Sequence, residues 1–291
     1  MRLIDCGVNL THASFDKDRE QVLRDAEAAG VSPVIITGTN VEESGRAQRY
    51  AAACNTASVK KCFSTVGVHP HDAKTCDENT VAQLRALALR PEAVAIGECG
   101  LDYNRDFSPR EVQRAWFEKQ IELAAELDMP LFLHERDAFD DFYSILQNIK
   151  NIRKIKKAVH CFTGTGRELD AYLSLDCYIG ITGWICDERR GVHLHPLVSR
   201  IPADRLLIET DAPYLAPRTL RENRRSGRNE PRYLVHIARY IADSIGKDPA
   251  LLARETFRNA CEFFDLPRDD HNEQYYFGAI REYPAGNIPQ T

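Results

Sequence analysis

The sequence predicts an α/β protein, a single (β/α)8 TIM-type barrel with a short C-terminal arm. Three observations predict this fold. Eight short apolar runs recur along the chain, helix-like segments separate them, and the 291 residues accommodate the roughly 250 that such a barrel typically needs. The runs are continuous rather than alternating, which is typical of parallel strands covered on both faces. A doubly wound open sheet is the structural alternative, but no G-x-G-x-x-G motif follows the first run.

The expected strands follow the apolar runs in order. They cover residues 3–4, 33–36, 63–66, 94–96, 131–133, 158–159, 178–181 and 206–208. Each run is too short for a helix and is bounded by polar residues or glycine, so we interpret each as a buried strand.

The segments between the runs carry helix signals. The clearest start is at Ser108, whose spacing to Glu111 is that of a capping box, with Pro109 at the first helical position. Apolar side chains then continue at helical spacing: Phe117, Ile121, Ala124 and Ala125. An Asp-Pro pair at residues 248–249 predicts the start of a late helix.

We expect one domain followed by a tail. Residues 1–264 would form the barrel, and residues 265–291 are polar with a few aromatic residues, prolines and a glycine, which indicates an arm after the last helix. Lys154, Lys156 and Lys157 precede the sixth run, at the end of the barrel opposite its catalytic rim, and we expect all three to be solvated.

Composition and charge exclude several classes of protein. The formal net charge of −5 gives no attraction of the whole molecule to nucleic acid or to an anionic membrane, so a polyanionic partner would need local positive charge. No apolar run is long enough to cross a bilayer. Nine cysteines without a C-x-x-C pair suggest neither a zinc ribbon nor a disulfide framework, and indicate an intracellular protein with reduced thiols. The first residues lack the apolar stretch of a signal peptide, which leaves cytoplasmic, nuclear and mitochondrial locations open.

Side chains that can bind metals follow five of the eight runs: His69, Glu98, His134, His160 and Asp211. In a barrel these positions converge on the rim at the carboxyl ends of the strands, where catalytic groups gather. Each residue by itself has an ordinary structural explanation, such as a hydrogen-bonded histidine or an aspartate that caps a helix. Together, on one rim, they favour a metal site.

Seven motifs along the chain resemble one known family. The segments GVHPHD, AIGECGLDY, HER, VHCFTGT, YIGITGW, LLIETDAPYL and RNEP are similar to those of the TatD family of metal-dependent deoxyribonucleases, from residue 4 to about residue 264. The resemblance implies a TIM-type barrel that hydrolyses DNA phosphodiester bonds. It also implies that the metal ligands are Glu98, His134, His160 and Asp211.

One departure from the wider family concerns the first strand. Most members carry His-x-His where this chain has Gly7, Val8 and Asn9, so two imidazole ligands are missing here. The namesake branch of the family resembles this variant. The remaining two carboxylates and two histidines would bind a hard divalent ion, with magnesium favoured over manganese or zinc.

A second group of residues is expected to hold the substrate phosphate. Six arginines follow the last strand: Arg218, Arg221, Arg224, Arg225, Arg228 and Arg232. Guanidinium groups suit phosphate oxygens, although a solvated basic loop is the alternative explanation. The residues expected to contact phosphate are His69, His71, Arg136, Arg228, Asn229 and Glu230.

The predicted reaction is hydrolysis of DNA by an exonuclease that acts on single-stranded ends in the 3'-5' direction, in DNA repair or DNA degradation. The expected catalytic residues are Asp211, Glu98, His69 and Arg136, with Asp211 orienting or deprotonating the attacking water. We expect a monomer that binds single-stranded DNA and no membrane. Two alternatives are a barrel metallohydrolase that cleaves a C–N bond and a nucleic-acid-binding protein without catalysis.

Overall fold

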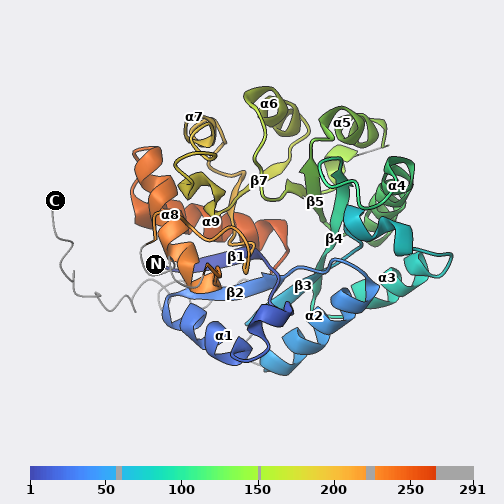
Figure 1. Ribbon diagram of the computed structural model, residues 1–291, viewed down its shortest axis with the longest axis horizontal. Helices are drawn as coiled ribbons and strands as arrows, with labels where there is room; N and C mark the ends of the chain where they lie inside the picture. The colour runs from blue at the N-terminus through green and yellow to red at the C-terminus, as the bar shows by residue number, and fades with distance from the viewer. Residues whose placement is uncertain (57–60, 150–151, 221–226, 267–291) are drawn as a thin grey trace.

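Eight parallel strands form one sheet whose spatial order is the order of the sequence, β1 to β8 (Figure 1). The computed structural model describes residues 1–56, 61–149, 152–220 and 227–266. The strands are β1 (Leu3–Val8), β2 (Val31–Ile36), β3 (Cys62–Val66), β4 (Ala93–Asp102), β5 (Leu131–Arg136), β6 (Lys157–Val159), β7 (Tyr178–Ile181) and β8 (Leu206–Ile208). The barrel closes where the amide of Asp211 donates to Gly7 at 2.9 Å and the amide of Asn9 donates to Ala212 at 2.7 Å. The predicted (β/α)8 barrel is confirmed.

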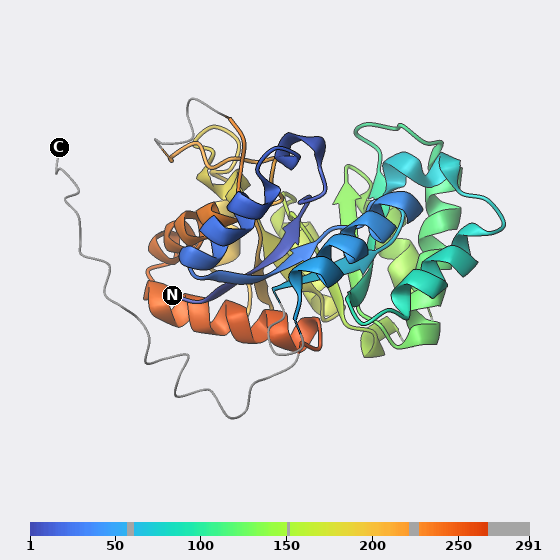
Figure 2. The same ribbon diagram turned by 90° about the horizontal axis from the view of Figure 1, so that it is seen from below.

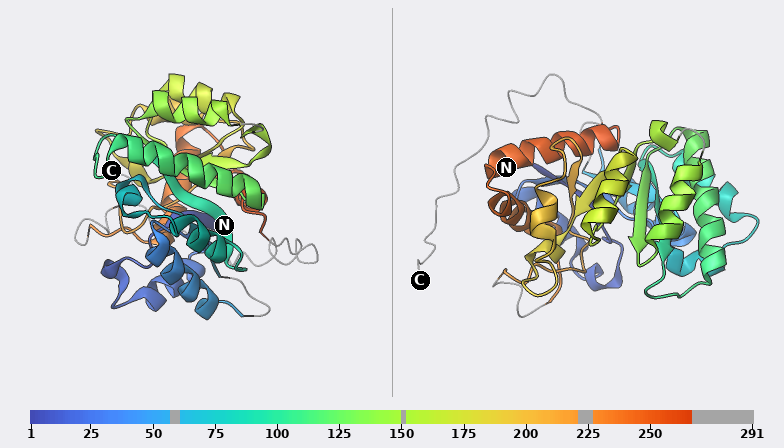
Figure 3. Two further views of the ribbon diagram at one scale, coloured as in Figure 1. Left: turned by 90° about the vertical axis from the view of Figure 1, so that its right-hand side faces the viewer. Right: turned by 90° about the horizontal axis from the view of Figure 1, so that it is seen from above.

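Helices surround the sheet and follow the strands along the chain (Figure 1). They are α1 (Arg19–Ala28), α2 (Val41–Cys54), α3 (Thr80–Ala88), α4 (Arg110–Leu127), α5 (Phe139–Asn148), α6 (Gly166–Ser174), α7 (Leu194–Val198), α8 (Leu234–Ser244) and α9 (Pro249–Phe263). Helices α3, α4 and α5 lie on the side of the barrel opposite α8 and α9 (Figures 1 and 3).

The barrel has an apolar layer inside the sheet as well as a larger core between sheet and helices. Helix α9 covers the end where the strands begin (Figure 2), and its last residue, Phe263, joins the inner layer together with the following Phe264. The rings of Phe264 and Phe132 lie 6.2 Å apart, and those of Phe263 and Tyr178 lie 5.2 Å apart. Because this end is sealed, only the opposite end, where the strands finish, is left for a site.

Strand β4 is longer than expected and continues from residue 96 to Asp102. Two glycines make this possible. A side chain at Gly97 would come within 2.1 Å of the Phe132 carbonyl, and one at Gly100 within 1.9 Å of the His134 carbonyl, so β4 lies too close to β5 for any Cβ there. Both glycines also have strongly positive φ angles. Glu98 therefore lies inside a strand rather than after it.

One predicted cap is wrong and another is confirmed. Helix α4 begins after Pro109, and the Ser108 hydroxyl donates to the His71 carbonyl at 2.8 Å instead of capping the helix. The hydrogen bond to the loop after β3 therefore replaces the predicted capping contact of Ser108. At α9 the Asp248 side chain accepts from the amide of Leu251, as expected.

The prediction for Lys157 is also wrong, since this side chain is fully buried. Its ammonium donates to the carbonyls of Ile152 and Ile155, each at 3.0 Å, which compensates for the lost water. Lys154 and Lys156 are exposed as expected. The predicted arm lies outside the described residues from 267 onward. No helix in the described part of the chain is long and apolar enough to cross a membrane.

Candidate metal centre and active site

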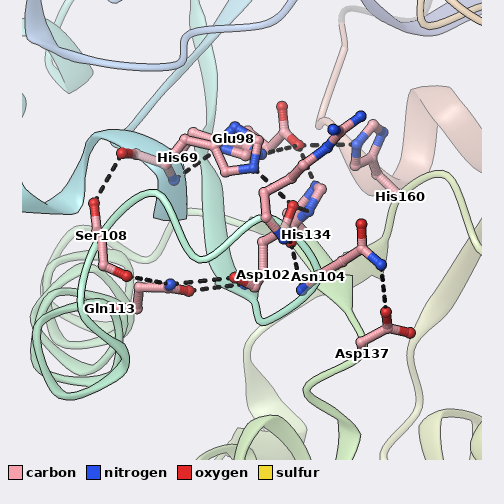
Figure 4. A network of polar contacts seen from close by, with 11 residues as sticks. His69, Glu98, Asp102, Asn104, Ser108, Gln113, His134, Asp137 and His160 are labelled. Atoms are coloured by element: carbon pink, nitrogen blue, oxygen red, sulfur yellow. Dashed lines mark hydrogen bonds and ion pairs between the residues drawn. The ribbon is translucent and has the colours of Figure 1, made fainter.

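One oxygen of Glu98 lies against three histidines at the rim of the barrel (Figure 4). Its Oε1 atom is 2.8 Å from His134 Nδ1, 3.0 Å from His160 Nε2 and 3.4 Å from His69 Nε2. Glu98 is only 5% exposed, so its charge has little contact with solvent. The histidines come from β5, from the end of β6 and from the loop after β3. The structure thus brings together Glu98, His69, His134 and His160, four of the five residues that the sequence predicts on one rim.

The alternation of side chains between the two faces of a strand explains why two of these histidines point into the barrel. In β5, Phe132 belongs to the inner apolar layer, so His134 two residues later also faces into the barrel. Ala158 and His160 are related in the same way. The ring of Phe132 lies 4.9 Å from that of His160 and packs against it from the inner apolar layer. The inner apolar layer therefore forms the floor of the polar site.

Asp102, which the sequence analysis missed, contacts His71 and the second ring nitrogen of His134. Its Oδ2 atom is 2.7 Å from His71 Nε2 and 3.3 Å from His134 Nε2. The side chain is buried and its other oxygen accepts the amides of Asn104 and Arg105. The available sequence signal was a second acid in the same strand, four residues after Glu98.

Glu209 is a second functional residue that the sequence analysis missed. It has no exposed surface, and its Oε1 atom lies 3.2 Å from His160 Nδ1 and accepts the Cys161 amide at 2.5 Å. Leu207 belongs to the inner layer, so the two-residue period of a strand would have indicated Glu209 as the next inward side chain.

Gly7 makes room for Glu209. A Cβ atom on Gly7 would lie 2.7 Å from Glu209 Oε2, and a Cβ atom on Gly180 would lie 2.6 Å from Oε1. The position that carries histidine in the wider family therefore borders a buried carboxylate in this chain. Space, rather than an unusual φ angle, favours glycine here, since Gly7 is not among the residues with positive φ.

Asp211 reaches the rim through a turn after β8. It has a φ of 54°, a left-handed conformation that aspartate tolerates better than most residues. Its Oδ1 atom accepts from Asn9 Nδ2 at 2.9 Å, so the asparagine that replaces the second missing histidine holds this carboxylate. Burial raises the pKa of Asp211 to about 7, with the charges of Glu98 and Glu209 adding to the rise and that of His160 opposing it.

Burial and charge act in opposite directions on the central residues. Burial would raise the pKa of Glu98, but the neighbouring histidines hold it well below its usual range. For His134, burial acts to lower the pKa, yet Asp102 and Glu98 raise it to about 9. Burial dominates at His69 and lowers its pKa to about 4. The carboxylates Glu209 and Glu98 also raise the pKa of His160 against its burial. Positive charge at His134 and His160 therefore stabilises the buried carboxylates.

This donor set fits a divalent metal ion. His69, Glu98 and His134 each offer a ligand atom, and the three atoms lie within 4.8 Å of one another. A metal would replace the positive charge that protons supply to the histidines. Three protein ligands that leave positions open for water or substrate are typical of catalytic sites.

Among the residues expected to bind phosphate, Arg136 is available on the rim and Arg228 is paired with carboxylates. Arg136 is exposed at the end of β5, paired in register with Asp102 of β4, and so lies on the rim. Arg228 instead contacts Asp18 at 2.7 Å and Glu230 at 2.8 Å.

The rest of the RNEP motif is buried. Asn229 has no exposed surface and donates to the Thr210 carbonyl at 2.8 Å, and Glu230 is 8% exposed. The motif therefore ties the end of β8 to the start of α1. Arg221, Arg224 and Arg225 lie outside the described residues.

Residues 4–265 match the sequence model of the family described as TatD related DNase. The chain belongs to this family. This membership confirms the family that the motifs indicated and makes the chain a nuclease of the hydrolase class.

Two relatives of this chain that carry the TatD name support this assignment. A 3'-5' ssDNA/RNA exonuclease TatD from Erwinia billingiae is 52% identical over 266 residues, which cover 91% of this chain and 100% of the relative. The protein of the same name from Escherichia fergusonii is 49% identical over 265 residues, which cover 91% of this chain and 99% of the relative.

Solved structures share the fold. A hydrolase TatD family protein from Entamoeba histolytica superposes with a TM-score of 0.82 at 25% identity, covering 92% of this chain and 99% of that one. A TatD homologue from Escherichia coli K12 has a TM-score of 0.81 at 24% identity, covering 91% and 99%.

Proposed function

We propose that this TatD-family chain is a metal-dependent exonuclease that removes nucleotides from the 3' end of single-stranded DNA. The observation that carries the proposal is the contact of Glu98 with three histidines on the open rim of the barrel. The direction and the single-stranded substrate are supported by the relatives described as 3'-5' ssDNA/RNA exonucleases, which match over their whole length. RNA is therefore a second substrate to test. Such chemistry would serve DNA repair or the degradation of DNA ends.

The proposed metal ligands are Glu98, His134, His160 and Asp211, as the family resemblance implies, together with His69. His69 belongs to the group whose ligand atoms lie within 4.8 Å of one another. A divalent cation, when bound, supplies positive charge to the phosphate and lowers the pKa of a bound water. We propose magnesium as the physiological ion, with manganese and zinc as the alternatives that an imidazole-rich site would also accept.

The remaining roles follow from position on the rim. The carboxylate of Asp211, which Asn9 orients, is placed to accept a proton from the attacking water. Arg136 and His71 are placed to hold the phosphate, and Asp102 orients His71 through the contact at 2.7 Å. We assign His69 to the metal rather than to the phosphate contact expected from the sequence.

Arg228, Asn229 and Glu230 receive a different role from the one predicted. We infer that they brace the site, because Arg228 is paired with two carboxylates and Asn229 has no surface with which to contact a phosphate. Asn229 holds the carbonyl of Thr210, the residue before Asp211. Its contribution to catalysis would thus pass through the position of Asp211.

The test is digestion of single-stranded oligonucleotides labelled at either end, with magnesium, manganese or zinc and with EDTA. Release of single nucleotides from the 3' end, abolished by EDTA, is the expected result. Glu98→Gln, which removes the charge at the centre of the site and keeps its shape, should lower the rate by on the order of 100-fold or more while circular dichroism stays unchanged. Products from the 5' end or from internal cleavage would contradict the proposed direction.

The same assay addresses the two alternatives. Binding of the oligonucleotide without cleavage under every metal would favour a nucleic-acid-binding protein. A cyclic amide substrate that is hydrolysed while DNA is not would favour a C–N hydrolase. The proposed unit is a monomer in which residues 1–264 carry the activity, and gel filtration of the active protein tests the monomer.

A further inference from the structure

Two aromatic side chains remain strongly exposed in the described part of the chain. The large hydrophobic side chains with substantial exposure there are Leu89, Phe107, Val192, Tyr214 and Leu251. The two aromatic members, Phe107 at 54% and Tyr214 at 51% exposure, both belong to rim loops next to residues of the site. Single exposed apolar residues are common on proteins, so their position is what makes this pair informative.

Phe107 lies in the loop between β4 and α4 and connects directly to the histidine cluster. Its ring is 4.7 Å from that of His71, and the His71 ring is 4.2 Å from that of His69. The loop is held in place, because Lys74 Nζ donates to the Phe107 carbonyl at 2.8 Å. The ring therefore stands beside the site on a braced backbone while half of its surface faces solvent.

Tyr214 lies in the loop after β8, three residues beyond Asp211. Its amide donates to the Asp211 carbonyl at 3.0 Å, and its ring packs edge-on against His12 at 5.6 Å. Its position relative to Asp211 is thus set by a backbone hydrogen bond. In a barrel of eight strands in sequence order, β4 and β8 are opposite each other, so the loops carrying Phe107 and Tyr214 face one another across the mouth.

We propose that Phe107 and Tyr214 are stacking platforms for unpaired nucleobases on either side of the scissile phosphate. This inference rests on the proposed nuclease function and names what selects its substrate. Every base has a flat face that stacks on an aromatic ring, so such platforms accept any sequence. In a duplex these faces are already stacked on neighbouring pairs. The platforms therefore favour single-stranded ends.

Charge at the rim is local and leaves a part for contacts to the bases. The net charge of −5 provides no general attraction to a nucleic acid. Among the residues expected to hold phosphate, Arg228 is already paired with Asp18 and Glu230. Arg105 and Arg136 are exposed at the ends of β4 and β5 and can meet phosphates, and contacts to the bases would add binding that does not depend on charge.

The test compares normal oligothymidylate with the same strand carrying abasic residues at its 3' end. The variants are Phe107→Ala and Tyr214→Ala, with Leu89→Ala as the matched control, since Leu89 is an exposed apolar residue at the far end of α3. For the normal strand, each aromatic-to-alanine variant should raise KM by about 5- to 150-fold. For the abasic strand the same variants should match the wild type, and Leu89→Ala should match it with both strands. Tyr214→Phe should retain the wild-type KM, because it keeps the ring.

A second readout separates this inference from the proposed function. Phe107→Trp places a fluorophore at the rim, and its emission relative to wild type should be quenched by normal oligothymidylate in EDTA, where no cleavage occurs. Abasic strands should not quench it. If wild type does not cleave single strands but Phe107→Trp is still quenched by normal oligothymidylate, the proposed nuclease function is overturned and the base platform stands. Equal KM changes on normal and abasic strands, or an absence of quenching, would overturn the platform.

Discussion

His160 Nδ1 lies 3.2 Å from Oε1 of Glu209, a carboxylate with no exposed surface. The other ring nitrogen, Nε2, faces Glu98 at 3.0 Å. A carboxylate behind a ligating histidine fixes the orientation of the ring and raises its basicity. Glu209 is thus placed to determine how His160 approaches a metal.

Glu209→Gln is therefore expected to weaken metal binding by about 10- to 100-fold, because the amide lacks the charge that supports His160. Titration calorimetry with manganese measures this. Glu135→Gln is the matched control: Glu135 follows His134 but binds the Ala138 amide and the Tyr172 hydroxyl instead. Equal manganese affinity in Glu209→Gln and wild type would remove Glu209 from the site.

Gly7→Ala should destabilise the protein by about 1–3 kcal/mol, because the new methyl group would lie 2.7 Å from Glu209 Oε2 and 3.1 Å from Phe132. Urea unfolding measures the change. Gly45→Ala in α2 is the control. The nearest atom there is the flexible end of Arg49 at 3.3 Å, and alanine favours a helix, so stability should be unchanged or higher.

The close approach of Gly7 to Glu209 also limits whether the two missing histidines can be restored. Asn9→His should fold, whereas Gly7→His should fail unless Glu209 moves. If Gly7→Ala unfolds at the wild-type urea concentration, Glu209 has room to shift, and the double histidine variant becomes feasible.

Arg136→Ala should flatten the salt dependence of single-strand binding by about 0.7 in the log–log slope, the value for one lost phosphate contact. Arg228→Ala should leave this slope unchanged, because its guanidinium is paired with Asp18 and Glu230. Fluorescence anisotropy across a salt series, in EDTA, measures both. A reduced slope in Arg228→Ala would return Arg228 to the phosphate site.

Asp187 provides a prediction on pH and stability. It is 3% exposed, and although burial acts to raise its pKa, the amides of Arg189 and Arg190 and the Arg190 guanidinium lower it to about 2. The ordinary value is 3.8. A pKa lowered by folding contributes stability above pH 3.8 that is lost as the pH falls toward 2. Asp187→Asn should thus cost up to about 2 kcal/mol at pH 7.

Chemical unfolding of wild type and Asp187→Asn at pH 7, 4 and 3 checks this. The difference in unfolding free energy should be largest at pH 7 and should shrink below pH 4. A difference that stays constant with pH would show that the charge of Asp187 is not what stabilises the loop.

Local patterns were enough to predict the barrel and part of its site. Continuous apolar runs predict buried parallel strands, because both faces of such a strand must be covered. Strand ends in this fold share one rim, so the sequence alone predicts Glu98, His134 and His160 close together. The Asp248 cap was predictable for the same reason, since it involves only neighbours in the sequence.

Contacts between distant segments were not predictable in this way. Ser108 had the spacing of a cap, but a carbonyl from another loop took its hydroxyl. Lys157 looked solvated, but its ammonium found carbonyls in the turn before β6. Arg228 was expected at a phosphate, yet Asp18, 210 residues away in the sequence, lies within 2.7 Å.

The sequence by itself determined the fold, the family and the central acid with its histidines, because strand periodicity and strand ends depend on short stretches of chain. Only the tertiary structure decided that Asp102 and Glu209 stand behind the histidines, that Asn9 holds Asp211, and that Gly7 borders a buried carboxylate. These relationships join residues from strands that are neighbours or next neighbours in the barrel, and most of them are far apart in sequence. They depend on distances of a few ångströms between side chains, which closure of the barrel sets and no local pattern records.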